Sequence, residues 1–282
     1  MRILVTLIAA LFAAPGFAAS ALATATAVQP PAWIETNGHK HALAAGEVIV
    51  AGDHLTTGAG ARVHIELAED SIVKLGESAD FVVPMLESVA LKGDPQQESQ
   101  VFKAALKVLA GAFRFTTRAL GKPKAREVDV TIGVATAGIR GTDIWGKSDR
   151  AQDLIALLEG HIEVARAGDA PQKMDEAGTF FVVPHGKAPE PVKPAPAKTV
   201  AGWAAQTELD ADGIAMYATG TYSVTVATAL TREQALSEVR RLSDRGYAAE
   251  IATAAGGFAA VMHGFGSQAE ANRFGQGMRK VR

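Results

Sequence analysis

The fold of this 282-residue chain is set around one stretch, Thr136-Ala137-Gly138-Ile139-Arg140-Gly141-Thr142-Asp143-Ile144. Its apolar residues and glycines are typical of a strand region that another backbone approaches closely. Arg140 lies between two glycines, and two interpretations of its side chain are open. The guanidinium either contacts a partner, or binds backbone carbonyls and a carboxylate such as Asp143 within the sheet. We favour the second, because long charged side chains are buried only when they are paired.

Short alternating runs surround this stretch between Pro30 and about His185. Apolar residues recur at every second position, which predicts strands, in Val63, Ile65 and Leu67, in Phe113 and Phe115, and in Ile162 and Val164. Residues 97–112 fit both helical and strand spacing, and we expect a short helix or loop to about Lys103, then a strand with a glycine bulge. Residues 109–115 and 158–164 resemble each other, but two copies are too few to establish a repeat fold.

The N-terminus predicts export. Arg2 supplies one positive charge, residues 3–14 form an apolar run, and small residues follow. We expect residues 1–23 to be a signal peptide cleaved after Ala21-Leu22-Ala23, with Gly16-Phe17-Ala18 as a competing site. An uncleaved membrane anchor is the alternative, but a span needs about 20 apolar residues. Because the chain has no cysteine, neither a lipid anchor nor a disulfide is expected, and the predicted location is the periplasm.

Two further segments follow the β-rich part, which is predicted to span residues 30–185. Residues 186–218 are rich in Pro, Ala and Lys, as expected for a semi-rigid spacer. Residues 219–282 predict a strand, a helix opened by the capping box at Thr231 and Gln234, two strands, and a second helix that begins near Ser267. This order suits a small sheet with helices on one face.

The first domain resembles FecR domains. Gly138, Ile139, Arg140, Gly141 and Thr142 match that family's signature, and Leu158-Glu159-Gly160 follows in the family's order. The resemblance implies a mainly β domain of stacked short strands, solenoid-like or sandwich-like. The best-known members are periplasmic parts of transmembrane sigma-factor regulators. This chain departs from them, and we expect no cytoplasmic part.

The C-terminal part resembles SPOR domains, which bind the glycan strands of peptidoglycan. The resemblance implies a small α+β, ferredoxin-like or RNP-like fold, and rests on residues 222–227 and 258–265. It places the glycan-binding candidates on the sheet face away from the helices: Ser223, Thr225, Thr228, Phe258 and Ala260. Thr225 and Ala260 stand where the family usually has Gln and Arg, which counts against the ligand more than against the fold.

The net charge and the sequence motifs argue against several classes of function. The net charge of −2 suggests no nucleic-acid partner, although residues 219–282 carry eight Lys or Arg against five Asp or Glu. The histidines do not form a set of three or four metal ligands with local carboxylates, so no metal or other cofactor is expected. No motif fixes a catalytic pair among the carboxylates, so we expect no enzyme.

The sequence therefore predicts an exported, non-catalytic envelope protein with no stable membrane span after signal cleavage. Its SPOR-like tail is expected to bind peptidoglycan, while the FecR-like domain presents a surface to an envelope protein that the sequence does not identify. The alternative is a soluble periplasmic signalling or assembly module whose tail binds protein and not glycan.

Overall fold

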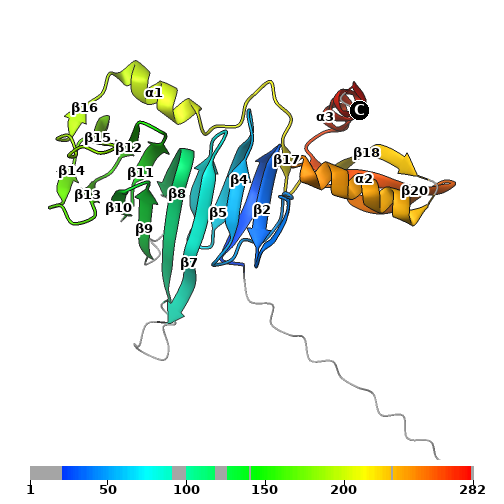
Figure 1. Ribbon diagram of the computed structural model, residues 1–282, viewed down its shortest axis with the longest axis horizontal. Coiled ribbons are helices and arrows are strands. Elements are labelled where there is room, and N and C mark those ends of the chain that lie inside the picture. Colours follow the sequence, from blue (N-terminus) through cyan, green and yellow to red (C-terminus); the bar gives the residue numbers. More distant parts are fainter. Residues whose placement is uncertain (1–20, 91–99, 118–125, 140, 230, 281–282) are drawn as a thin grey trace, which may run out of the picture.

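The computed structural model describes residues 21–90, 100–117, 126–139, 141–229 and 231–280 (Figure 1). The described chain is mainly β, which confirms the predicted class. A large β domain comes first, and its strands are β1 (Ala23–Gln29), β2 (Ala32–Thr36), β3 (His39–Ala42), β4 (His54–Thr57), β5 (Arg62–Leu67), β6 (Ser71–Leu75), β7 (Asp80–Ala90), β8 (Gln100–Thr117), β9 (Arg126–Ile132), β10 (Ala135–Ile139), β11 (Asp143–Ser148), β12 (Gln152–Glu159), β13 (Ile162–Arg166), β14 (Gln172–Met174) and β15 (Thr179–Pro184). Residues 1–20 of the expected signal peptide, and Arg140, lie outside the described residues.

The β domain consists of two hydrogen-bonded β-sheets that share one strand, and we call them ladder A and ladder B. Ladder A has the order β1-β5-β6-β8-β11-β12-β15. Ladder B has the order β3-β2-β4-β7-β8-β9-β10-β13-β14. The long strand β8 belongs to both, because its first part pairs with β7 and β9 and its last part pairs with β6 and β11. Among the described strands every pairing is antiparallel except β8–β9.

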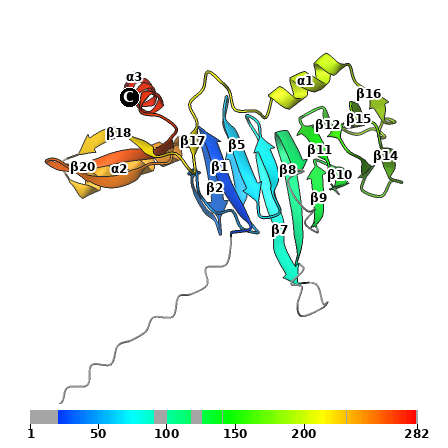
Figure 2. The same cartoon turned by 180° about the vertical axis from the view of Figure 1, so that it is seen from behind.

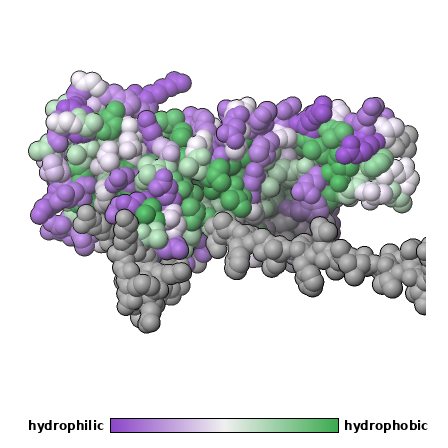
Figure 3. Space-filling model, turned by 90° about the horizontal axis from the view of Figure 1, so that it is seen from below, coloured by the Kyte–Doolittle hydropathy of each residue, from purple (hydrophilic) through white to green (hydrophobic). Residues whose placement is uncertain are grey.

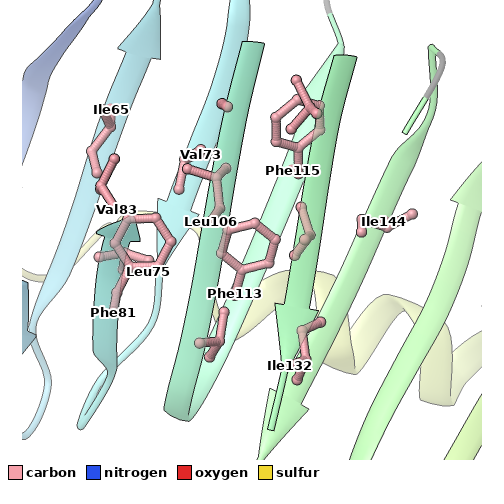
Figure 4. Packing of buried hydrophobic residues seen from close by; sticks show 14 of the residues in the cluster. Ile65, Val73, Leu75, Phe81, Val83, Leu106, Phe113, Phe115, Ile132 and Ile144 are labelled. Carbon is pink, nitrogen blue, oxygen red and sulfur yellow. The ribbon is translucent and has the colours of Figure 1, made fainter. Parts of the chain in front are cut away.

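The hydrophobic core lies between the two ladders. The rings of Phe81 in ladder B and Phe113 in ladder A stack with their centroids 5.9 Å apart, and Figure 4 shows them facing each other. In β5, Val63, Ile65 and Leu67 point into this core, as the period-two pattern predicted. Each such side chain contributes roughly 1.5–3 kcal/mol when fully buried. Two facing, mostly antiparallel layers match the sandwich-like alternative better than a solenoid.

Glycines mark the places where the chain passes between the ladders. Gly111 in β8 has φ +81°, and a Cβ atom there would lie 2.5 Å from Cα of Ala79. Gly160, with φ +89°, stands between β12 of ladder A and β13 of ladder B. The resemblance between residues 109–115 and 158–164 therefore has a local cause: in both, a left-handed glycine redirects a strand before an alternating apolar run.

Two expectations about the β domain were wrong. Residues 100–103 are not a helix or loop, because β8 is already a strand at Gln100, with Phe102 and Ala104 in the core. Here the pairing with β7 and β9 outweighs the helix propensity of Ala, Lys and Leu. The fold also begins before Pro30, since β1 pairs with β5 from Ala23 onward and Leu22 packs against the core.

Residues 193–217, called here the strap, contain β16 (Lys193–Pro194), α1 (Ala197–Ala205) and β17 (Met216–Tyr217). β16 pairs with β15 at one edge of ladder A, and β17 pairs with β1 at the other edge. Between these ends the strap crosses the outer face of ladder A, and Figure 2 shows β16 and β17 on opposite sides of the β domain with α1 between them. The expected spacer is thus packed against the β domain, because its side chains find partners there.

The terminal unit consists of β18 (Tyr222–Ala229), α2 (Arg232–Asp244), β19 (Glu250–Ala254), β20 (Gly257–Phe265) and α3 (Gln268–Lys280), in the predicted order. The Thr231–Gln234 capping box is confirmed. The strands form an antiparallel sheet in the order β18-β20-β19, and α2 and α3 pack on one shared cluster that includes Val226, Leu242, Met262 and Ala271. No helix among the described residues is both long and apolar enough to cross a membrane.

The terminal unit is docked on the β domain. The indole Nε1 of Trp33 donates to the carbonyl of Ser243 at 3.0 Å, and the hydroxyl of Ser243 accepts from the amide of Ala42 at 2.9 Å. Gly246, with φ +80°, lies so close that a Cβ atom there would be 2.7 Å from Cβ of Pro31. β17 also pairs with β20, so ladder A continues into the terminal sheet.

Candidate functional site

The open face of the terminal sheet, turned away from α2 and α3, is one candidate binding surface. Ser223, Thr225 and Thr228 of β18 are exposed there. Their cross-strand partners are His263, Val261 and Ala259 of β20, and directly paired residues point to the same face. The structure therefore brings three of the five predicted glycan-binding residues together.

Ala260 and Phe258 do not belong to this face. Ala260 is only 1% exposed and lies in the cluster beneath the helices, and strand alternation places Phe258 on the same side. The prediction was wrong for both because it assumed the relative phase of two separate strands. That phase depends on the register and on the irregularity between Thr225 and Ala227, where β18 has one extra residue.

Sequence reasoning missed two residues of the open face. His263 pairs with Ser223, and Glu250 of β19 pairs with Val261, so both share the face of the hydroxyl groups, and both are exposed. Only the register of three strands brings them together, and no local motif in the sequence indicates it. The open face thus offers hydroxyl, imidazole and carboxylate groups to a ligand.

A cavity of about 460 Å³ lies where the terminal unit meets the β domain, and His263 and Glu250 also line it. From the β domain it is lined by His41 and Glu47, whose side chains form a hydrogen bond of 2.6 Å. The other carboxylate oxygen of Glu47 accepts from the amide of Ala44 at 3.0 Å. The cavity lining combines apolar and polar groups, and it contains no arginine or lysine among its described lining residues.

The structure describes four of the five predicted signature residues. Ile139 and Thr142 are buried, Gly138 and Gly141 are exposed, and Gly141 has φ +100°. Gly160 packs against this segment, since a Cβ atom there would lie 2.8 Å from Cγ2 of Thr142. The two sequence motifs are therefore neighbours in space.

Asp143, the carboxylate suggested as a partner for Arg140, is bound by another arginine. Arg114 of β8 binds it through two hydrogen bonds, Nε to Oδ1 at 2.9 Å and Nη2 to Oδ2 at 2.6 Å. The hydrogen bond to Asp143 raises the pKa of Arg114, although burial opposes it. Arg114 is thus paired with a carboxylate of the signature stretch, and it stands on the outer face of ladder A.

The outer face of ladder A holds the strap by charge. The carboxylate of Glu208 accepts from Nζ of Lys74 at 2.6 and 2.7 Å and from Nη1 of Arg114 at 2.7 Å. Burial raises the pKa of Glu208, but the hydrogen bonds and charges of Lys74 and Arg114 outweigh it and leave that pKa below its usual value. Nε2 of His64 donates to the carbonyl of Thr207 at 3.2 Å.

The same face also holds the strap by an aromatic contact. Trp203 of α1 stacks on Trp145 of β11, with centroids 5.4 Å apart and planes 6° apart, and meets Phe180 edge-on at 5.5 Å. Trp145 belongs to a small second cluster with Ala112, Leu154, Ala156 and Val182. These residues alternate with core residues along their strands, so the cluster lies on the side of ladder A opposite the core.

The β domain matches a known protein family over much of its length. Residues 53–163 match the family model described as FecR protein, which confirms the predicted FecR domain over this part of the chain. No group of three potential metal-ligating side chains is found within the described ranges.

Two crystal structures of a candidate anti-sigma factor from Parabacteroides distasonis ATCC 8503 are similar to this chain. One is 13% identical with a TM-score of 0.40, and the match covers 68% of this chain and 74% of that one. The other is 12% identical with a TM-score of 0.39, covering 69% and 74%. No curated protein matches the sequence. The resemblance of the terminal unit to SPOR domains stays a prediction.

Proposed function

We propose that this protein is an exported, non-catalytic interaction module of the bacterial cell envelope, in which the FecR-containing β domain and the terminal unit act as one rigid body. The observation that carries the proposal is the strap, which pairs with both edges of ladder A and joins β17 to both β1 and β20. Two units held at a fixed spacing suit a protein that positions partners. The FecR match supports a protein as the partner of the β domain.

Export is part of the proposal, and the fold bears on where the signal peptide is removed. The amide of Ala68 donates to the carbonyl of Leu22, and Ala23 is 2% exposed within β1. Cleavage after Ala23 would remove both residues from the fold, whereas cleavage after Ala18 keeps them. We therefore predict that the mature chain starts at Ala19. N-terminal sequencing of the protein from the periplasm checks this, and a start at Thr24 would contradict it.

Binding of peptidoglycan glycan strands by the terminal unit is the second candidate function. It is favoured by the three exposed hydroxyl groups of Ser223, Thr225 and Thr228 on a sheet face that no described helix covers. Such groups can exchange hydrogen bonds with sugar hydroxyls. The apolar surface does not indicate a binding site more clearly than the open face does. On the side shown in Figure 3, the hydrophobic residues form separate patches among hydrophilic ones.

One experiment discriminates the two candidates. Labelled full-length protein is added to envelope preparations that were treated beforehand with a protease, with a glycan hydrolase, or with neither. Retention that the protease abolishes indicates a protein partner, and retention that the hydrolase abolishes indicates glycan. Absence of retention on untreated envelopes would contradict both.

A pair of matched variants then tests the open face. Thr225→Val removes a hydroxyl from that face, whereas Thr253→Val removes an exposed hydroxyl from the opposite face of the same sheet. If the open face binds glycan, only Thr225→Val lowers hydrolase-sensitive retention, by roughly fivefold for the loss of one hydrogen bond. Equal retention of both variants and the wild type would exclude the open face.

A further inference from the structure

On the outer face of ladder A, two sets of side chains contact the strap. The first is apolar: Trp203 lies on Trp145 and against Phe180, over the cluster formed by Ala112, Leu154, Ala156 and Val182. Without Trp203, the flat face of Trp145, now only 1% exposed, would be open to water. Exposed aromatic surface next to a polar rim is typical of a binding surface for another segment.

The second set of side chains is cationic. Lys74 and Arg114 stand side by side, because Lys74 of β6 and Arg114 of β8 are paired in register. Together they bind the carboxylate of Glu208, which follows Trp203 by five residues. Asp143 neutralises Arg114 in part, but Lys74 has no other carboxylate partner among the described contacts. The face therefore selects an aromatic ring and a carboxylate at a defined spacing.

Besides these two side chains, Thr207 holds this part of the strap, since it is fully buried and its carbonyl accepts from Nε2 of His64 at 3.2 Å. Helix α1 contributes no buried residue, and Pro196 at its N-terminal end makes no side-chain capping bond. Beyond Glu208, the side chain of Gln29 bonds to the backbone of Asp210 at 3.1 and 3.0 Å. A segment held by a few side-chain and backbone contacts can be exchanged for another that offers the same aromatic and carboxylate groups.

We propose that the outer face of ladder A is a peptide-binding surface that the strap occupies in cis, and that its partner is a protein segment with an aromatic residue followed five positions later by Asp or Glu. The proposal rests on the proposed function, because it names the surface and the chemistry by which the β domain takes a protein partner. The strap shows which groups that ligand must carry, and it competes with the ligand for the same surface.

The test uses the full chain and a labelled synthetic peptide of residues 197–212 as the probe. In the variant Trp203→Ala/Glu208→Gln the strap loses both groups, and the face becomes free for the peptide in trans. We expect this variant to bind the peptide at least about tenfold more tightly than the wild type, in which the strap must first be displaced. Glu208→Gln alone should give intermediate binding, and it provides the measurement if the double variant does not fold.

Two controls make the result specific. The same peptide carrying Trp203→Ala and Glu208→Gln should not bind the double variant. Adding Lys74→Gln to the double variant should weaken binding, whereas adding Lys198→Gln, an exposed strap lysine, should not.

Equal binding of both peptides, or no difference between the wild type and a folded strap variant, would overturn the inference. A strap variant that sediments as a dimer would overturn it too, since the face would then take a second copy of the chain. Protease-sensitive envelope retention that is unchanged by Lys74→Gln would place the protein partner elsewhere, and would leave the proposed function standing while this inference falls.

Discussion

At the scale of single residues, His64 is the clearest case of a side chain whose chemistry is set by the strap. Burial lowers its pKa, the hydrogen bond to the carbonyl of Thr207 raises it, the charge of Lys74 lowers it again, and the net shift is downward. The folded protein therefore holds the imidazole neutral at a pH where the unfolded chain already binds a proton. Stability must then rise with pH through this range.

We predict that the free energy of unfolding falls as the pH drops below about 6.5, the ordinary pKa of histidine, by at most about 1.4 kcal/mol per pH unit for this one proton. The loss ends once the pH is below the folded-state pKa. The variant His64→Gln keeps a hydrogen-bond donor without titrating, so its stability should decline less. Urea unfolding of both proteins at about pH 7.5 and about pH 5.5 measures this, and parallel declines would contradict it.

Residue positions also show where sequence reasoning ends. Alternation correctly placed Val63, Ile65 and Leu67 in one core, since a strand's own period is local. It could not relate Ser223 to Ala260, because the phase between two strands depends on pairing and on the extra residue near Val226. Likewise it did not connect Arg114 with Asp143, 29 residues later, because Arg114 reaches that carboxylate through the β8–β11 pairing.

At the scale of elements, the contact between α2 and the strand β2 depends on one glycine. Gly246 combines a left-handed backbone with close approach to Pro31, Ala32 and Trp33. Gly256, in the turn between β19 and β20, has nearly the same φ, but no atom lies within 4 Å of the position that a Cβ would take there. Alanine substitutions at the two positions therefore distinguish the effect of backbone strain from the loss of contact between the terminal unit and the β domain.

We predict that Gly256→Ala lowers stability by about 1–2 kcal/mol, the cost of a left-handed alanine. Gly246→Ala should lower it by a further 1–3 kcal/mol or so, because its methyl group overlaps the β domain. It should also increase proteolysis between the β domain and the terminal unit, which Gly256→Ala should not. Urea unfolding and limited proteolysis check this, and indistinguishable variants would argue against the docked arrangement.

The elements themselves were largely predictable, and their partners were not. The order of strands and helices in the terminal unit follows from local signals such as the capping box at Thr231. The strap shows the opposite case: its proline-rich composition is typical of a spacer, yet Trp203 and Glu208 fix it to ladder A. The stacking of Trp203 on Trp145 joins residues 58 positions apart, and the ion pair of Glu208 with Lys74 joins residues 134 positions apart, which no local pattern indicates.

At the scale of the whole molecule, ladder A, the strap and the terminal sheet form one connected structure. β17 lies between β1 and β20, so the terminal unit continues the β domain directly. A tail on a free spacer would sample many orientations. The proposed function requires the contrary, because a module that positions two partners must hold its two binding surfaces at a fixed distance.

The most direct test of that claim is the distance distribution between the two units in solution. The chain has no cysteine, so Lys107→Cys on β8 and Thr228→Cys on β18, both exposed, can carry a pair of spin labels without other changes. Pulsed electron–electron double resonance on the doubly labelled full-length protein should give one narrow distribution of distances between the two labels. A broad distribution, as expected for two units joined by a flexible tether, would contradict the account.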